Sequence, residues 1–158
     1  MALILEGYST CAICNQVLDK DRAYIGTPAT TSNMLDDLFQ MNDCGIHVDC
    51  LDAHPLKEKL TNYLERLNQL FPFDQQTCIV DGQPITNISD FFCTFLLTSD
   101  PAEALFKFNY LVINQKNIPK WKDREEFIFE VKRFLEEGKW KAFNDHPYLQ
   151  NILLEMEQ

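Results

Sequence analysis

Two residue pairs with the same three-residue step constrain most strongly how this chain can fold. Cys11 and Cys14 form a Cys-x-x-Cys pair, and His47 and Cys50 form a His-x-x-Cys pair. Two thiolates on one tight turn, with an imidazole and a thiolate on one face of a first helical turn, can hold the same metal ion. Three sulfurs and one nitrogen complete a tetrahedral shell that suits zinc and leaves no position for water. We therefore expect one structural Zn²⁺, which adds folding free energy and activates no nucleophile.

Cys44 leaves the exact ligand set open. It precedes His47 by the same step, so it could replace one of its neighbours as a ligand. We expect Cys44 to be a spectator, because Cys11 and Cys50 fit the layout of the two pairs better. The alternative for the whole set is a group of buried thiols, since cysteine is often buried as a small apolar residue. The 32 residues between Cys14 and His47 also make a long connection, which needs packing of its own.

The order of these parts resembles a treble-clef zinc module over about residues 8–54: a knuckle, a hairpin, and a ligand pair at a helix start. The chain is also similar to a set of small, largely uncharacterised bacterial proteins that open with a CAIC knuckle and later carry an H-x-x-C-L/F segment. This resemblance implies that the two pairs carry the metal, and it implies no function. RING and LIM patterns need eight ligands, and no further Cys-x-x-Cys follows Cys50, which excludes a ubiquitin ligase.

The net charge of −10 lies entirely in the first two thirds of the chain. Residues 1–106 carry 5 basic and 15 acidic side chains, whereas residues 107–158 carry 9 of each. A surface of this sign repels phosphate backbones, so we expect no binding to nucleic acid. Nuclease activity is excluded on the same ground, because residues 1–54 hold 2 basic and 8 acidic side chains. A basic protein is the partner that this charge favours.

Other features of the chain predict a cytoplasmic protein that does not enter a membrane. No stretch approaches the roughly 18 consecutive apolar residues of a membrane span. The first ten residues have no basic segment and include Glu6, unlike a signal peptide. Without secretion, the six cysteines are expected to be thiols or metal ligands rather than disulfides.

The predicted fold class is α+β. A treble-clef zinc module over residues 1–54 precedes an α+β body over residues 55–158, in which a small antiparallel sheet packs with two or three helices and shares a core with the module. The elements that we expect are a hairpin joining Val17–Leu18 to Tyr24–Ile25, helices over Gly45–Ala53, Pro55–Leu70 and Lys122–Glu137 and after Pro147, and strands at Cys78–Val80, Phe91–Leu97 and Leu105–Ile113.

Nothing outside the two pairs forms a catalytic set. Cys78 and Cys93 lie in apolar runs without a nearby base, which favours core packing over a reactive thiol. His54 and His146 each precede a proline, which suits a capping or surface role. Two sets of aromatic residues could line a ligand pocket or anchor an interface, although core packing is the commoner role for each. They are the stripe Phe91, Phe92, Phe95, Phe106, Phe108 and Tyr110, and the pair Trp121 and Trp140.

These observations predict a zinc-stabilised acidic binding protein rather than an enzyme. We expect a bacterial immunity protein that neutralises a cognate basic toxin domain through protein–protein contact, because the chain is small, acidic and without a catalytic set. One alternative is a cytoplasmic regulatory or adaptor protein in which zinc is architectural. A second is an enzyme with a pocket on the aromatic sheet.

Overall fold

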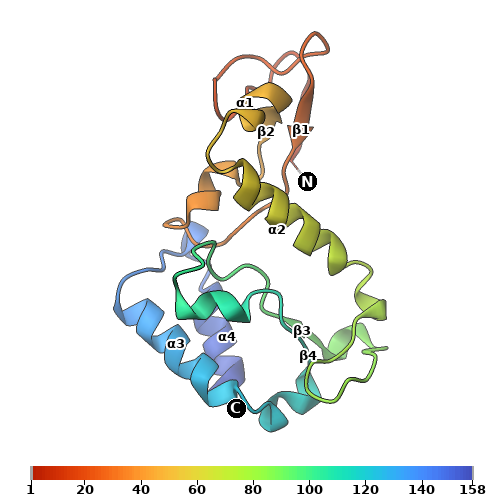
Figure 1. Ribbon diagram of the computed structural model, residues 1–158, viewed down its shortest axis with the longest axis vertical. Coiled ribbons are helices and arrows are strands. Elements are labelled where there is room, and N and C mark those ends of the chain that lie inside the picture. The colour runs from red at the N-terminus through yellow and green to blue at the C-terminus, as the bar shows by residue number, and fades with distance from the viewer. Residues whose placement is uncertain (1, 158) are drawn as a thin grey trace.

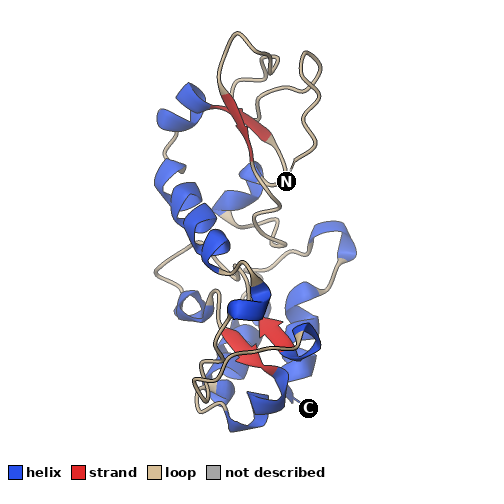
Figure 2. Ribbon diagram, turned by 90° about the vertical axis from the view of Figure 1, so that its right-hand side faces the viewer, coloured by secondary structure: helices blue, strands red, loops and turns tan. Residues whose placement is uncertain are grey.

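The computed structural model describes residues 2–157 and is α+β, as the sequence predicts (Figures 1 and 2). Within these residues, four short strands and four α-helices alternate with 3₁₀ turns. No helix of the described residues is both long and apolar enough to cross a bilayer. In chain order the elements are β1 (Tyr24–Gly26), β2 (Gly45–His47), α1 (Val48–Asp52), α2 (Lys57–Gln69), β3 (Phe91–Cys93), β4 (Val112–Asn114), α3 (Arg124–Glu136) and α4 (Tyr148–Glu157).

The strands form two separate two-stranded antiparallel sheets, one in each part of the chain, and the sheet of the body has two strands where we expected three. β1 pairs with β2, placing Tyr24 opposite His47, and β3 pairs with β4, placing Phe92 opposite Ile113. The first sheet lies beside α1 in the N-terminal part, and the second lies beyond the far end of α2 (Figure 1). Each sheet therefore organises its own end of the molecule.

Helix α2 connects two hydrophobic cores. Leu60 and Tyr63 pack into the core of the N-terminal part, whereas Leu70, just after the helix, belongs to the core of the body. Leu67 lies against both cores. This is the apolar face that the 3.6-residue spacing of the segment predicts. A helix that contributes to both cores couples the N-terminal part to the body.

Helix α3 provides the largest buried face of the body. Phe127 and Val131 are fully buried, and the ring of Phe127 packs edge-on against Phe108 with their centroids 5.2 Å apart. The helix ends before Gly138, whose φ of +68° is the left-handed conformation expected there. Trp121 stacks within this core, 5.5 Å from Phe127, so it serves packing rather than an exposed interface.

The predicted hairpin between residues 17–18 and 24–25 is wrong. Val17 instead forms a bridge with Thr10. The partner of β1 is β2, which follows the long connection in the chain. The helix expected over Gly45–Ala53 also begins later, because its first three residues are β2. The backbone amides and carbonyls of these residues form hydrogen bonds with β1, so they are not available for a helix.

The predicted strands of the body are also partly wrong. The segment Cys78–Val80 runs into a turn, and only Phe91–Cys93 of the second predicted strand is extended. The third predicted strand is a 3₁₀ turn over Ala104–Phe108 followed by β4. Phe95 and Tyr110 have φ values of +44° and +60°, and these left-handed residues interrupt the extended runs.

The long connection between β1 and β2 folds back on itself. Thr27 is fully buried, and its hydroxyl donates to the carbonyl of Met41 at 2.7 Å. Thr30 is also buried, and its hydroxyl donates to the carbonyl of Leu38 at 2.8 Å. The side chains of Leu38 and Met41 join the N-terminal core. The connection therefore has the packing of its own that its length requires.

Candidate metal centre

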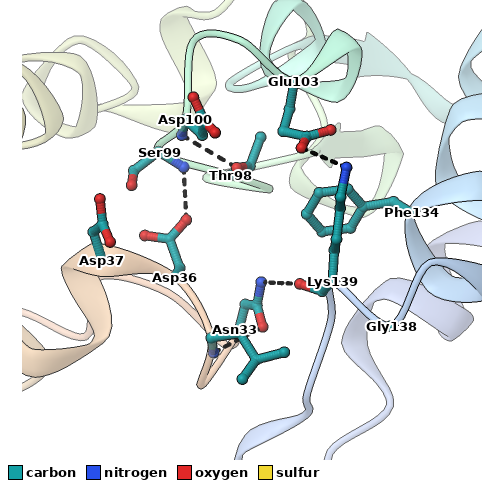
Figure 3. Close-up of a pocket in the computed structure, with 11 residues that line it drawn as sticks. Asn33, Asp36, Asp37, Thr98, Ser99, Asp100, Glu103, Phe134, Gly138 and Lys139 are labelled. Carbon is teal, nitrogen blue, oxygen red and sulfur yellow. Dashed lines mark hydrogen bonds and ion pairs between the residues drawn. The ribbon is translucent and has the colours of Figure 1, made fainter.

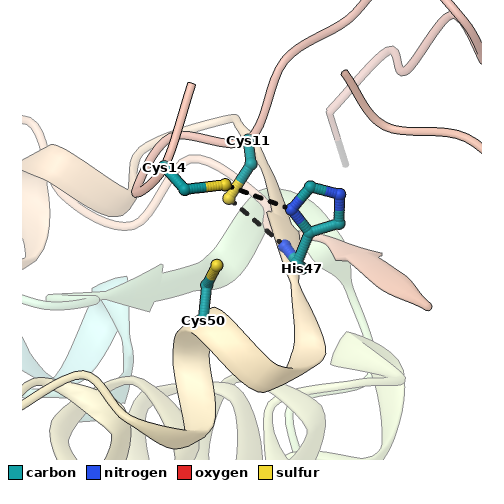
Figure 4. Close-up of side chains that lie close together, drawn as sticks. All are labelled: Cys11, Cys14, His47 and Cys50. Carbon is teal, nitrogen blue, oxygen red and sulfur yellow. Dashed lines mark hydrogen bonds between the residues drawn. The ribbon is translucent and has the colours of Figure 1, made fainter. Parts of the chain in front are cut away.

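Cys11, Cys14, His47 and Cys50 converge on one point (Figure 4). Their ligand atoms all lie within 4.8 Å of one another, and the Cys14 Sγ is 3.4 Å from the His47 Nδ1. Donors at about 2.0–2.3 Å from a tetrahedrally bound metal lie roughly 3.5–3.8 Å apart. The four side chains are therefore close enough to hold one metal ion with little movement.

The first two donors are placed by a tight turn. The amide of Asn15 donates to the carbonyl of Cys11 at 2.9 Å, and the amide of Ile13 donates to the Cys11 Sγ at 3.4 Å. The amide of Ala12 donates to the carbonyl of Gly45 at 2.9 Å, which ties the turn to β2. The backbone thus positions the Cys11 sulfur and supplies it with a hydrogen-bond donor.

The other two donors come from the junction of β2 and α1. His47 is the last residue of β2 and precedes the first residue of α1, and Cys50 lies in the first turn of that helix. The amide of His47 donates to the Cys11 Sγ at 3.4 Å, so the strand end is fixed to the turn. The His-x-x-Cys step therefore places both side chains toward Cys11 and Cys14.

The close approach of the turn to β2 depends on Gly45. A Cβ at this position would lie 2.2 Å from the Leu18 Cδ1 and 3.1 Å from the Ile4 Cδ1. Leu18 is fully buried, so it has no free space into which it can move. Only glycine fits at this position of the strand that carries His47, because Leu18 and Ile4 fill the space beside it.

The four donors differ in burial and in acidity. Cys11 and His47 are buried, whereas Cys14 and Cys50 are half-buried. The backbone amide of Gln16 lowers the pKa of Cys14 to about 6, with further help from His47. Burial, together with the hydrogen bonds to Cys14 and Cys11, raises the pKa of Cys50 to about 11. Cys14 therefore ionises readily near neutral pH, whereas Cys50 keeps its proton there until a cation binds it.

The imidazole of His47 has the surroundings of a metal ligand. Only 1% of the residue is exposed. Its Nδ1 faces the sulfur of Cys14, and its Nε2 is buried with no hydrogen-bond partner among the described residues. A buried polar ring without outside partners is unfavourable in an apolar setting. The residues present fit a metal ion bound at Nδ1, which points to the Cys14 sulfur, whereas the buried Nε2 would still have no partner among the described residues.

Arg22 is a component of the site that the sequence reasoning missed. Its Nη2 donates to the Cys50 Sγ at 3.1 Å and its Nη1 to the Cys14 Sγ at 3.7 Å. Nη1 also donates to the Gln16 Oε1 at 2.9 Å, and Nε and Nη2 hold both carboxylate oxygens of Asp49. The Arg22 guanidinium lowers the pKa of the Asp49 carboxyl. The sequence offered one indication, because Arg22 is one of only two basic residues in the acidic segment 1–54.

Cys44 lies outside the group of four. Its Sγ is 3.4 Å from the Thr27 Oγ1, and burial raises the pKa of its thiol. Its amide donates to the same Thr27 hydroxyl at 3.1 Å, so the residue closes the long connection between β1 and β2. The structure therefore gives Cys44 a packing role and gives Cys11 and Cys50 the positions next to His47.

The remaining residues singled out from the sequence do not assemble with the four. Cys78 and Cys93 are buried in the body, and burial raises the pKa of Cys93 to about 11. The Nδ1 of His54 accepts the amide of Leu56 at 3.2 Å in the turn before α2, whose N-terminus has no side-chain cap. The aromatic stripe is divided, because Phe92 and Phe108 are buried whereas Phe95 and Phe106 are 37% and 40% exposed.

No protein-family model, curated protein or solved structure matches this chain. The assignment of the site therefore rests on the geometry of its own residues.

A second concavity lies between the long connection and the body and has a volume of about 330 Å³ (Figure 3). Its lining includes Asp36, Glu103 and Lys139. The Asp36 Oδ2 accepts the amide of Ser99 at 2.6 Å, and the Glu103 Oε1 is 2.7 Å from the Lys139 Nζ. Both carboxylates therefore already have partners within the chain, and these contacts hold the walls of the concavity together.

Proposed function

We propose that Cys11, Cys14, His47 and Cys50 bind one structural zinc ion, and that the chain is a zinc-stabilised acidic binding protein. The convergence of four protein donors carries this proposal. Three thiolates and one imidazole suit zinc in preference to harder cations. A shell filled by protein leaves no position for a water nucleophile, so the metal stabilises the fold of the N-terminal part.

The order of the elements supports a treble-clef arrangement for this part. A knuckle at residues 11–14 precedes a strand pair, and the second ligand pair follows at the start of α1. The zinc would join the knuckle to β2 and α1, where the amide bonds from Ala12 and His47 already connect them. The metal thus replaces part of the hydrophobic core that so short a segment lacks.

Charge supports a basic protein as the partner. Lys20 is the one exposed basic side chain of described residues 2–54, since Arg22 is half-buried and bound to Asp49. Such a surface accelerates association with a positively charged protein. We propose an immunity protein that neutralises a basic toxin domain by covering it. The exposed acidic residues of this part are Glu6, Asp21, Asp37, Asp43, Asp49 and Asp52.

The metal is tested by native mass spectrometry of the untagged protein and of three variants. We expect one zinc per wild-type chain, lost in Cys11→Ser and His47→Ala and kept in Cys44→Ser. Cys44→Ser is the matched control, because it removes a thiol close to the site but outside the group of four. A folded wild-type protein that contains no metal would refute the zinc centre.

The partner is tested by co-purification from the native host at low and high salt, followed by charge reversal. We expect a basic protein that is retained at low salt and released as salt screens the contact. The double variant Glu6→Lys/Asp21→Lys should slow association, whereas Glu125→Lys/Glu136→Lys on α3 should not. If no basic protein is retained and both double variants behave as wild type, the immunity function is wrong and a regulatory role becomes the better explanation.

A further inference from the structure

Arg22 lies over the two thiols of the metal centre that are not fully buried. Cys11 is completely covered by the chain, but Cys14 and Cys50 are half-buried, so their sulfurs face the surroundings of the site. The guanidinium of Arg22 contacts both, at 3.7 Å and 3.1 Å. No other charged side chain of the described residues donates to these two sulfurs. Arg22 therefore occupies the side from which solvent and reagents would approach.

The guanidinium is held in this position by other residues. Asp49 binds it through both carboxylate oxygens, at 3.0, 3.1 and 2.8 Å. Gln16 accepts from the Nη1 at 2.9 Å. Asp49 precedes Cys50 in the first turn of α1, and Gln16 follows the knuckle that carries Cys14. The anchors of Arg22 thus come from both halves of the ligand set.

The chemistry of a metal-bound thiolate explains what such a contact can do. Three thiolates, a neutral imidazole and Zn²⁺ leave the centre with one net negative charge. Hydrogen bonds from a cation to the sulfurs stabilise that charge and draw electron density away from their lone pairs. A bound thiolate with less available electron density attacks electrophiles more slowly and is protonated less readily.

We propose that Arg22 is the positioning residue of the metal centre, which holds the thiolates of Cys14 and Cys50 in place and shields them from electrophiles. The proposal rests on the zinc function put forward above. This role differs from that of a plain surface ion pair between Arg22 and Asp49. An exposed pair of that kind contributes little to stability and would not change the reactivity of the sulfurs.

The test compares zinc-loaded wild type with Arg22→Gln, Arg22→Lys and Asp49→Asn. Arg66→Gln is the matched control, because Arg66 lies on α2 and, among the described residues, its side chain donates to Gln69 and not to the metal centre. Three quantities are measured for each protein. They are the zinc affinity by competition with a chromogenic chelator, the rate of zinc release by excess N-ethylmaleimide, and the position of the thiolate-to-metal charge-transfer band after replacement of zinc by Co²⁺.

In Arg22→Gln we expect zinc affinity to fall roughly 10-fold to 100-fold, as for other residues that support metal ligands. Release by N-ethylmaleimide should accelerate, and the charge-transfer band should shift. Arg22→Lys and Asp49→Asn should give intermediate values, because the first keeps a positive charge but loses the planar fork, and the second keeps the fork but weakens the anchor that holds it. Arg66→Gln should match the wild type in all three measurements.

The two proposals fail in different ways. If the wild-type protein binds no zinc, both are wrong. If it binds one zinc, and Arg22→Gln shows the wild-type release rate and charge-transfer band, the role of Arg22 is overturned while the zinc centre stands. Should Arg22→Gln not fold, Arg22→Lys and Asp49→Asn decide the same question, and wild-type values in both would overturn the role of Arg22.

Discussion

The Nδ2 of Asn33 donates a hydrogen bond of 2.9 Å to the carbonyl of Lys139, across 106 positions of sequence. The Oδ1 of the same side chain accepts the amides of Leu35 at 3.1 Å and Lys141 at 3.0 Å. Asn33, whose bond to Lys139 is drawn in Figure 3, is only 2% exposed, and it forms an isolated bridge with Ala142. The connection between β1 and β2, whose ends lie beside the metal centre, is thus fastened to the segment between α3 and α4.

Asn33→Ala should destabilise the protein by about 2–4 kcal/mol, because it leaves three backbone groups without their partner in a buried place. Asn87→Ala is the matched control. Asn87 is exposed, and its side-chain Oδ1 accepts the amide of Ser89, so the loss of this side chain should cost about 0.5–1 kcal/mol. Chemical denaturation of the zinc-loaded proteins measures both values. If both variants lost the same free energy of unfolding, the hydrogen bonds of Asn33 to residues 139 and 141 would contribute no more than a local turn does.

Zinc affinity should fall as pH falls. With its pKa raised to about 11, Cys50 is protonated near neutral pH before metal binds, so binding releases this proton. Cys14, with its pKa lowered to about 6, is mostly ionised at pH 7 and takes up a proton below its pKa. The logarithm of the affinity should therefore rise by at least about one unit per pH unit above pH 7, and more steeply below about pH 6. Competition titrations across this range measure the slope, and a flat profile would contradict metal binding by these thiols.

Gly45→Ala should destabilise the metal centre by about 1–3 kcal/mol, because the added methyl group would collide with Leu18 in a filled core. Gly26→Ala on β1 is the milder comparison, since its Cβ would lie 3.2 Å from the Ile4 Cδ1. Thermal unfolding and zinc content should both show a larger loss for Gly45→Ala. If the two variants lost equal amounts of stability and zinc, the packing of Leu18 against Gly45 would be looser than its geometry indicates.

Phe127→Ala should reduce the free energy of unfolding by about 3–5 kcal/mol, because it removes a fully buried ring from contact with Phe108 and Trp121. Phe129 lies two residues away on the same helix and is 63% exposed, so Phe129→Ala should change the value by less than about 0.5 kcal/mol. Urea denaturation compares the two. A loss in Phe129→Ala as large as that in Phe127→Ala would show that α3 is buried on a different face.

The group of four donors and the main helices could be found from the sequence because their patterns are local. Cys11 and Cys14 share one turn, and the helical spacing around Phe127 and Val131 repeats within a few residues. The place of Arg22 could not be found in this way. Its contact with Cys50 spans 28 residues and depends on how the knuckle closes against α1.

The pairing of the strands was mispredicted for a similar reason. Segments 17–18 and 24–25 are close in sequence, but the ladder of β1 closes with β2 across the long connection. In the body, dense aromatic runs predicted long strands, whereas Phe95 and Tyr110 adopt left-handed conformations that no residue preference indicates. Tertiary packing, rather than local preference, decides the conformation at these positions.

The hydrogen bonds of Asn33 to residues 139 and 141 also determine the order in which parts of the chain can fold during synthesis. All four donors are present once residue 50 has left the ribosome, whereas the carbonyl of Lys139 is made 89 positions later. Because chains fold progressively from the N-terminus, the knuckle and the α1 junction can assemble on a nascent chain. The connection between β1 and β2 cannot form these hydrogen bonds until residues 139–141 have been synthesised, which is after α3 and before α4.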